Sequence, residues 1–230
     1  MTYMLQKQFT RAHYRSGLLF VLTLQFLPAG TLLAVDWGDA PDPTYPTLAA
    51  STGAQHVTGG GLFFGAAVDD EADGQPTAAA DGDDLAGIDD EDGIVFATAV
   101  TQGSAATINI TASGAGLVDA WIDYNGDGDW LDAGEQILTN QAVVGGLNAI
   151  VTAVPVGASP GASFARFRIS TAGGLAPTGA SADGEVEDYQ VTISAAPPPA
   201  QQIPALSSIG LVLLSLLLGG LGFGRMRKKG

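Results

Sequence analysis

The stretch FARFRIS (residues 164–170) alternates strictly between two kinds of side chain. In an extended chain its apolar members point to one side and its charged members to the other, which predicts a strand. The apolar members are Ala165, Phe167 and Ile169, and the charged ones are Arg166 and Arg168.

Further short strands are predicted on both sides of this stretch. They fall at 94–96, 107–111, 117–124, 135–144 with a break at Asn140, 149–156 and 189–193. Short strands at this spacing, without an amphipathic helix, predict an all-β domain over residues 93–194. The expected architecture is a β-sandwich of the immunoglobulin-like or jelly-roll-like kind.

The segment 35–92 differs in composition from the strands that follow. It holds 14 acidic residues, no Lys or Arg, and many Gly and Pro. We expect a loop-rich segment with few strands that packs on the β-domain, with 61–68 (GLFFGAAV) as its best candidate strand.

The net charge of the chain limits the kinds of molecule that it can bind. The chain carries a net charge of −15, and all 24 acidic residues lie between Asp36 and Asp188. Two arginines against 24 acids leave −22 in that region, which repels nucleic acid and attracts divalent cations. The chain has no cysteine, which excludes disulfides and thiolate zinc sites.

Both ends have the composition of targeting segments. Residues 1–34 predict a signal peptide, with Lys7, Arg11 and Arg15 before the apolar run 17–27. An uncleaved N-terminal anchor is the alternative interpretation. At the other end, a Pro-rich linker (195–202) leads to the uncharged apolar run 203–224 and then to RMRKK. The order predicts a transmembrane helix with a cytoplasmic basic end, and an ordinary tail anchor is the alternative.

The stretch DYNGDGD (residues 123–129) is the most informative chemical motif. Calcium prefers six to eight oxygen ligands, and alternate oxygen side chains in a loop can surround one ion. We expect a calcium site, with Glu135 or Asp132 completing it, although position twelve of an EF-hand-type loop is Gly134 here. A solvated acidic turn is the alternative. The predicted ligands are Asp123, Asn125, Asp127, Asp129 and Glu135.

Three other Asp-rich stretches, 69–74, 81–84 and 89–93, are weaker candidates for calcium binding. Taken alone, each is at least as well explained as solvated acid.

Residues 183–189 (DGEVEDY) and 121–129 (WIDYNGDGD), together with the Arg-x-Arg strand, resemble the GEVED domain, and residues 35–93 resemble the segment that often precedes it. The tail from 203 to 230 resembles the IPTL-CTERM sorting signal of Gram-negative bacteria, with Ala205 where Thr is usual. The motif residues are Ile203, Pro204, Ala205, Leu206 and Ser207. The resemblances imply an extracellular β-domain of surface and adhesin-like proteins, and handling by an exosortase-type membrane protease.

The acidic residues of the stretch 183–189 need positively charged partners, and the predicted β-domain contains only two arginines. We expect partly buried Arg–carboxylate pairs across the sheet. The alternative is that Glu187 or Asp188 binds the calcium held by Asp123. The residues concerned are Arg166, Arg168, Glu185, Glu187 and Asp188.

Catalysis is not expected. After the predicted signal peptide the chain has one histidine, His56, no cysteine and no G-x-S-x-G motif. The expected function is an exported, envelope-anchored structural or adhesive protein with a calcium-stabilised domain. One alternative is a module that binds matrix polysaccharide through aromatic side chains, and a remote one is a carboxylate-pair glycosidase. The candidate aromatic residues are Trp37, Trp121, Trp130 and Tyr45, of which Trp121 is expected in the core.

Overall fold

The computed structural model describes residues 9–12, 19–22, 34–82, 88, 90–199, 212–213, 215–216 and 218. The chain divides into two compact units, residues 1–194 and 195–230. In the described part of the first unit nearly all regular structure is strand, so the prediction of an all-β fold is confirmed. The finer assignment to an immunoglobulin-like or jelly-roll-like sandwich stays a prediction.

The largest sheet has five strands in the order β6-β13-β11-β8-β9. The central strand β11 runs antiparallel to both β13 and β8, and the short β6 runs parallel to the end of β13. The strands are β6 (Val100–Thr101), β8 (Gly116–Ile122), β9 (Gln136–Val143), β11 (Gly161–Ser170) and β13 (Glu185–Ser194).

A second sheet, in the order β10-β7-β5, contributes to the same core. Its strands are β5 (Ile94–Phe96), β7 (Ala105–Ala112) and β10 (Gly146–Ala153). Ile108 and Ile110 of β7 belong to one buried apolar cluster with Phe167 and Ile169 of β11. The alternation predicted for both stretches is therefore confirmed, because each places its apolar side chains on this inner face.

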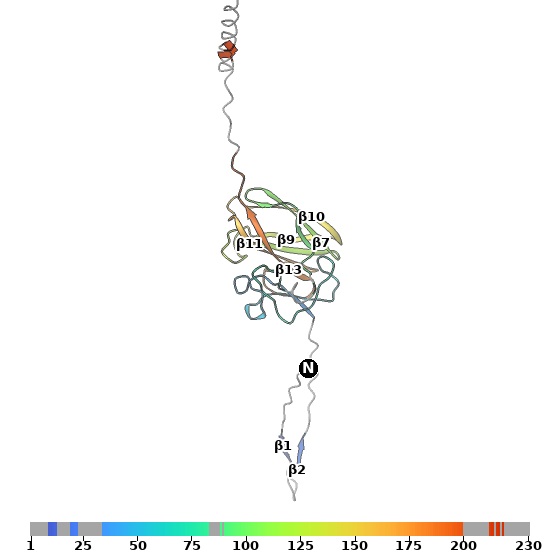
Figure 1. Ribbon diagram of the computed structural model, residues 1–230. Helices are drawn as coiled ribbons and strands as arrows, with labels where there is room; N and C mark the ends of the chain where they lie inside the picture. Colours follow the sequence, from blue (N-terminus) through green and yellow to red (C-terminus); the bar gives the residue numbers. More distant parts are fainter. Residues whose placement is uncertain are drawn as a thin grey trace, which may run out of the picture. The chain divides into compact units, whose positions relative to one another are not determined.

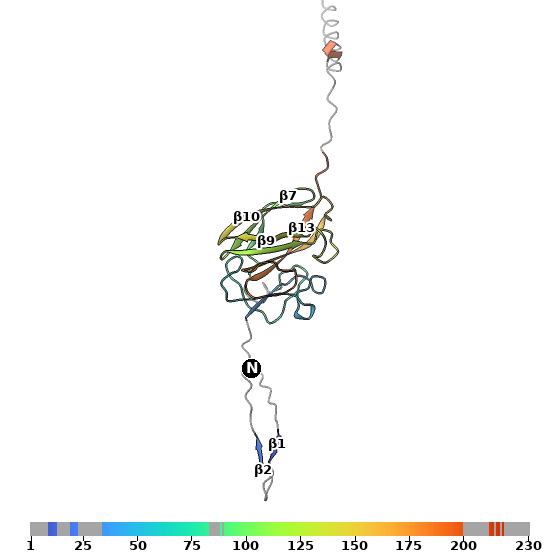
Figure 2. The ribbon, with the colours of Figure 1, turned by 180° about the vertical axis from the view of Figure 1, so that it is seen from behind.

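The N-terminal acidic segment covers the opposite, outer face of β11. Figures 1 and 2 show the loops of residues 34–82 gathered at one side of the β7–β13 strands. The segment holds a 3-10 turn, Ala49–Ser51, and a small sheet in the order β12-β4-β3. Its strands are β3 (Val35–Trp37), β4 (Ala54–Val57) and β12 (Gly179–Ser181). Because of this cover, both faces of β11 are buried from Ala165 to Ser170.

The strand expected at 61–68 does not form. The stretch makes only an isolated bridge between Phe64 and Ala112. Gly65 has a φ of 57°, which is incompatible with a continuous strand, and the N–H of Phe64 donates to the side chain of Glu185. The small sheet forms elsewhere, where β4 pairs with β12 from far along the chain.

The two terminal predictions are tested only in part. Within the predicted signal peptide the structure describes a hairpin of β1 (Phe9–Ala12) and β2 (Leu19–Leu22) and the last residue, Ala34, and the rest lies outside the described residues. The motif 203–207 also lies outside them. In the described part of 212–218 the residues are helical, and no helix among the described residues is long and apolar enough to span a membrane.

Candidate metal site

The loop between β8 and β9, residues 123–135, begins at a buried aspartate. Asp123 is fully buried, and its Oδ1 accepts a hydrogen bond from the Gly126 N–H at 2.6 Å. Its Oδ2 accepts from the Gly128 N–H at 3.0 Å and from the Tyr45 hydroxyl at 2.6 Å. Asp123 therefore holds the turn in shape and joins it to the N-terminal segment.

The next polar side chains each accept from a backbone N–H two residues further on. Asn125 Oδ1 accepts from the N–H of Asp127 at 2.8 Å, and Asp129 Oδ1 accepts from Leu131 at 2.8 Å. Such Asx turns require tight backbone geometry between them. Gly128 supplies it with a φ of 97°, and a Cβ there would lie 2.4 Å from the Thr44 side chain.

Three carboxylates gather at the open side of this loop. Oxygens of Asp127, Asp129 and Asp132 all lie within 4.8 Å of one another. Two ligands on opposite sides of a calcium ion, each at about 2.3–2.6 Å, would lie at most about 5 Å apart, so the spacing fits calcium. The Asn125 amide donates to Asp127 at 3.0 Å and to Asp132 at 2.5 Å, which keeps this neutral side chain beside the group.

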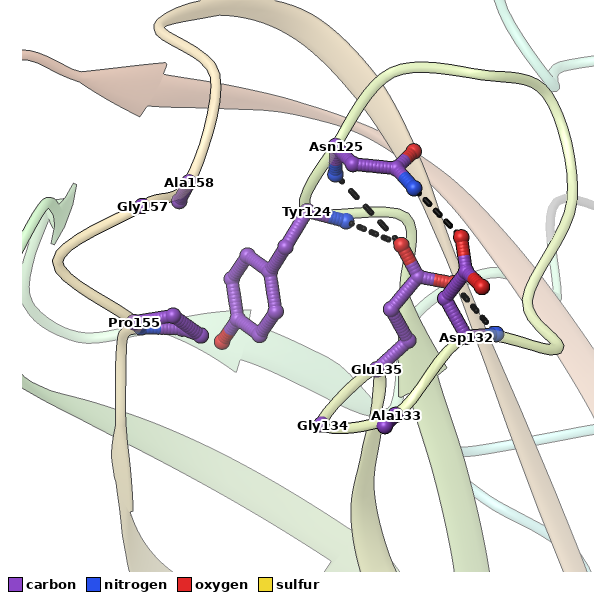
Figure 3. Close-up of a pocket in the computed structure, with 9 residues that line it drawn as sticks. All are labelled: Tyr124, Asn125, Asp132, Ala133, Gly134, Glu135, Pro155, Gly157 and Ala158. Carbon is purple, nitrogen blue, oxygen red and sulfur yellow. Dashed lines mark hydrogen bonds between the residues drawn. The ribbon is translucent and has the colours of Figure 1, made fainter.

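Glu135 takes a different role from the one expected of a ligand. Its Oε1 accepts from the N–H of Tyr124 at 3.0 Å, and its Oε2 accepts from the N–H of Asp132 at 3.3 Å (Figure 3). Burial raises the pKa of this carboxyl to about 7. Of the five predicted ligands, Asp127 and Asp129 converge together with Asp132, whereas Asp123 and Glu135 brace the loop through its backbone.

A pocket of about 410 Å³ opens beside the loop. Figure 3 shows the Tyr124 ring standing in it, between the Glu135 side and Pro155. Most of the remaining lining is small side chains or backbone, namely Ala133, Gly134, Gly157 and Ala158. The pocket offers room next to the carboxylates but no exposed aromatic platform for a sugar ring.

The four aromatic side chains considered for stacking are buried. None is more than 6% exposed. Tyr45 packs against Trp130, with ring centroids 4.6 Å apart, and against Phe164 at 5.0 Å. Trp121 belongs to the same cluster, as expected of a core residue. These rings hold the N-terminal segment on the outer face of the sheet and leave no surface on which a sugar could stack.

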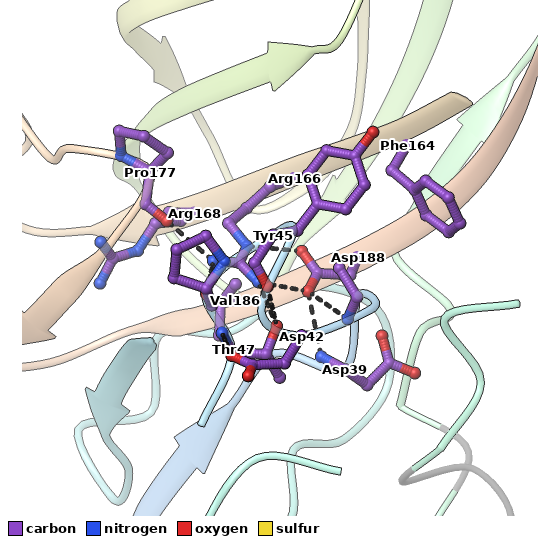
Figure 4. Close-up of polar contacts among 12 residues, drawn as sticks. Asp39, Asp42, Tyr45, Thr47, Phe164, Arg166, Arg168, Pro177, Val186 and Asp188 are labelled. Carbon is purple, nitrogen blue, oxygen red and sulfur yellow. Dashed lines mark hydrogen bonds and ion pairs between the residues drawn. The ribbon is translucent and has the colours of Figure 1, made fainter. Parts of the chain in front are cut away.

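The predicted Arg–carboxylate pair forms between Arg166 and Asp188. Both are fully buried, and the contact is bidentate, with Nε to Oδ1 at 2.7 Å and Nη2 to Oδ2 at 2.6 Å (Figure 4). Asp188 Oδ2 also accepts from the N–H groups of Asp39 and Ala40. The guanidinium lies 4.6 Å from the centroid of Trp130. The pair thus fastens the N-terminal segment to β11 and β13.

Arg168 is satisfied mainly by neutral acceptors rather than by the expected signature carboxylates. Its Nε donates to His56 Nε2 at 2.9 Å, and its Nη atoms donate to carbonyl oxygens that include those of Ala176 and Gly179. Burial and the two arginines lower the pKa of His56 well below its usual value, so its ring is neutral. Sequence analysis missed this contact because the two residues are 112 positions apart.

Glu185 and Glu187 do not pair with the arginines, which corrects the expectation. Cross-strand partners share a face, and Glu185 lies opposite Ile169 while Glu187 lies opposite Phe167, on the inner face. Glu187 accepts instead from the N–H of Gly93 at 3.0 Å and from the Tyr189 hydroxyl at 3.0 Å. Strand alternation alone, applied to 185–189, could have separated these two residues from Asp188.

Both glutamates are held in an environment that disfavours charge. Burial, followed by the negative charges of Glu187 and Asp36, raises the pKa of Glu185 to about 12. Burial likewise raises the pKa of Glu187. The alternative role for Glu187 and Asp188, as ligands of a calcium ion at Asp123, has no support in this geometry, since Asp188 is engaged by Arg166 and Glu187 by Gly93.

Two protein-family models match parts of this chain. The model of the GEVED domain matches residues 117–192, which run from β8 to β13 and include the loop and the buried ion pair. The chain contains a GEVED domain. After the GEVED domain, the IPTL-CTERM motif matches residues 201–228. Neither the curated proteins nor the solved structures gave a match.

The order of the two matches indicates where the protein is located and how it is processed. A C-terminal sorting signal of this kind indicates an exported, cell-surface protein and implies processing by an exosortase-like system. The GEVED domain precedes the signal, and the Pro-rich stretch from residue 195 separates the two.

Proposed function

We propose that this chain is a structural or adhesive surface protein of a Gram-negative envelope, whose GEVED domain is stabilised by calcium. The observation that carries the proposal is the order of its parts, with one GEVED domain followed by a sorting signal. On this proposal the apolar run 203–224 anchors the chain in the inner membrane at least until an exosortase-type protease acts on it. Other surface proteins or polysaccharide are the candidate binding partners.

The calcium component rests on the β8–β9 loop. Three carboxylates within 4.8 Å of one another repel each other unless a cation or protons intervene. Asp127 and Asp132 are exposed, so an ion has direct access from solvent. Calcium binding would join the two halves of the loop, since Asp127 precedes Trp130 and Asp132 follows it.

The polysaccharide-binding alternative has less support than the adhesive role. Stacking on a sugar requires exposed aromatic faces, and all four candidate side chains are packed into the domain. Among the described residues, no pair of carboxylates facing each other across a cleft favours a glycosidase, and the proposal remains that the chain is not an enzyme.

Surface display tests the proposal directly. An epitope inserted after Pro199 should be labelled by antibody on intact cells, and a variant lacking residues 203–230 should be found in the medium instead. Cells with the wild-type chain should attach to surfaces more strongly than cells without it, and chelation of calcium should reduce the difference. An epitope reached only after cell lysis, or attachment unaffected by the chain, would refute the proposed role.

A further inference from the structure

A second group of carboxylates lies away from the β8–β9 loop, where the acidic segment meets β13. Oxygens of Asp36, Glu71 and Asp90 all lie within 4.8 Å of one another. Unlike the loop group, this one is largely shielded from water, with Asp36 2% exposed and Asp90 4% exposed. Asp36 comes from β3, and Glu71 and Asp90 come from the loops between β4 and β5.

Backbone N–H groups hold these carboxylates in place. Asp36 Oδ2 accepts from the N–H of Val186 at 2.7 Å, and Glu71 Oε2 accepts from that of Trp37 at 3.0 Å. Asp90 Oδ2 accepts from the N–H of Asp69 at 3.0 Å. These hydrogen bonds to the backbone orient the three carboxylates, so the fold fixes the geometry of the group.

Glu185, which directly precedes Val186 on β13, provides an independent observation next to this group. Its side chain is buried, with the residue 1% exposed, and its Oε2 accepts from the N–H of Phe64. Its Oε1 is buried and has no hydrogen-bond partner among the described residues. The negative charges of Asp36 and Asp90 act on this carboxyl, and the next residue along β13 is the one that donates to Asp36.

The protein's own cations are engaged elsewhere. Arg166 and Arg168 are the only Lys or Arg residues between positions 16 and 224. The nitrogens of Arg166 donate to Asp188, to Thr47 and to carbonyl oxygens, and Arg168 donates to His56 and to carbonyl oxygens. A buried carboxylate oxygen left without a hydrogen bond is destabilising, so an external cation would stabilise this group.

We propose that Asp36, Glu71, Asp90 and Glu185 form a second calcium site, distinct from the β8–β9 loop, that fastens the acidic segment to the start of β13. Four carboxylates supply the hard oxygen ligands that calcium prefers. Magnesium gives up its water reluctantly, so a site this closed to solvent selects calcium. The site joins residues from 36 to 185, and its occupation therefore stabilises the attachment of the acidic segment to the start of β13.

Calcium stoichiometry separates the two sites. The full-length chain, in detergent solution, is dialysed against calcium, and bound metal is measured for the wild type, for Glu185→Gln, and for the Asp127→Asn/Asp129→Asn double variant. We expect two ions in the wild type and one in each variant. A wild type that binds no calcium, or a Glu185→Gln variant that binds as much calcium as tightly as the wild type, overturns the second site. If the loop variant binds no calcium at all, the second site does not exist, and the proposed loop site is still supported.

Terbium luminescence provides a readout that leaves the ligands unchanged. Tryptophan transfers excitation to a terbium ion only at short range, and Trp37 is hydrogen-bonded through its backbone to Glu71. We expect Trp37→Phe to lose the sensitised emission of the second site, with Trp130→Phe, beside the loop, as the matched control. Emission that survives Trp37→Phe and disappears in Trp130→Phe would mean that terbium occupies the loop alone, which contradicts the proposal.

Discussion

Arg166 is a fully buried cation whose donors all have partners within the protein. It meets Asp188 in a bidentate pair and also donates to Pro46, Pro177 and Thr47. A buried ion pair adds little net stability over apolar residues, but breaking it leaves an uncompensated charge. The pair also imposes sequence requirements nearby, because a Cβ on Gly38 would lie 2.4 Å from Asp188 Oδ2.

Replacing one partner of this pair should therefore be costly. We expect Asp188→Asn to lower the free energy of unfolding by about 3–5 kcal/mol, since Arg166 keeps its charge without a counter-ion. Urea unfolding of the variant and the wild type measures the loss. The double variant Arg166→Met/Asp188→Leu should recover part of it. A loss below about 1 kcal/mol for Asp188→Asn would contradict the role given to the pair, because exposed pairs have that magnitude.

At the scale of one element, β9 runs continuously from Gln136 to Val143 and is bulged at Asn140, where the sequence predicted a break. Asn140 has a φ of 49°, and the register of β8 with β9 shifts between Val118 and Ala120. The Asn140 N–H donates to Asp119 Oδ1 at 3.0 Å, and its side-chain oxygen accepts from Gly174 at 2.5 Å. Asparagine tolerates the left-handed region better than other residues with a Cβ, which explains its presence at the bulge.

Two substitutions at this position separate backbone strain from the lost hydrogen bond. Asn140→Gly and Asn140→Ala both remove the contact with Gly174, but only alanine places a Cβ in the left-handed region. We expect the alanine variant to be less stable than the glycine variant by about 1 kcal/mol in urea unfolding. Equal stability of the two variants would show that the positive φ carries no strain.

The whole first unit depends on contacts between its acidic segment and its strands. The segment's Asp39 and Ala40 donate to Asp188, Tyr45 donates to Asp123, and His56 accepts from Arg168. Asp127, Asp129 and Asp132 lie in the loop that begins at Asp123, so the proposed binding of calcium there would stabilise a region that the segment also contacts. Calcium should consequently raise the stability of the unit as a whole.

A thermal melt of the full-length chain in detergent tests this expectation. At calcium concentrations of 100 times the Kd, each site adds about 2.7 kcal/mol relative to excess chelator. For a protein of this size that corresponds to a rise in Tm of roughly 5–10 °C per site. Magnesium should raise the Tm less than calcium does. The Asp127→Ala variant should lose the part of the calcium-induced rise that comes from the loop site. Equal effects of the two cations, or no shift, would contradict a specific calcium site.

Local patterns in the sequence determined the all-β class, the inner and outer faces of residues 164–170, the irregular position at Asn140 and the two family resemblances. Each depends on residues within a few positions of one another, where alternation and turn chemistry act directly on the backbone. They also placed Asp127 and Asp129 in one loop, but named Asp123 as a ligand and left open whether Asp132 or Glu135 completes the group, whereas Asp132 is the residue that lies beside them.

The tertiary structure alone decided which distant groups meet. It brought His56 to Arg168, Tyr45 to Asp123, and Asp36 with Asp90 to the start of β13. It also placed the small sheet at β3, β4 and β12 rather than at 61–68. The physical reason is that burial and unmet hydrogen-bonding capacity determine these contacts. Both arise only when segments that are distant in the sequence are packed together, and no local pattern records them.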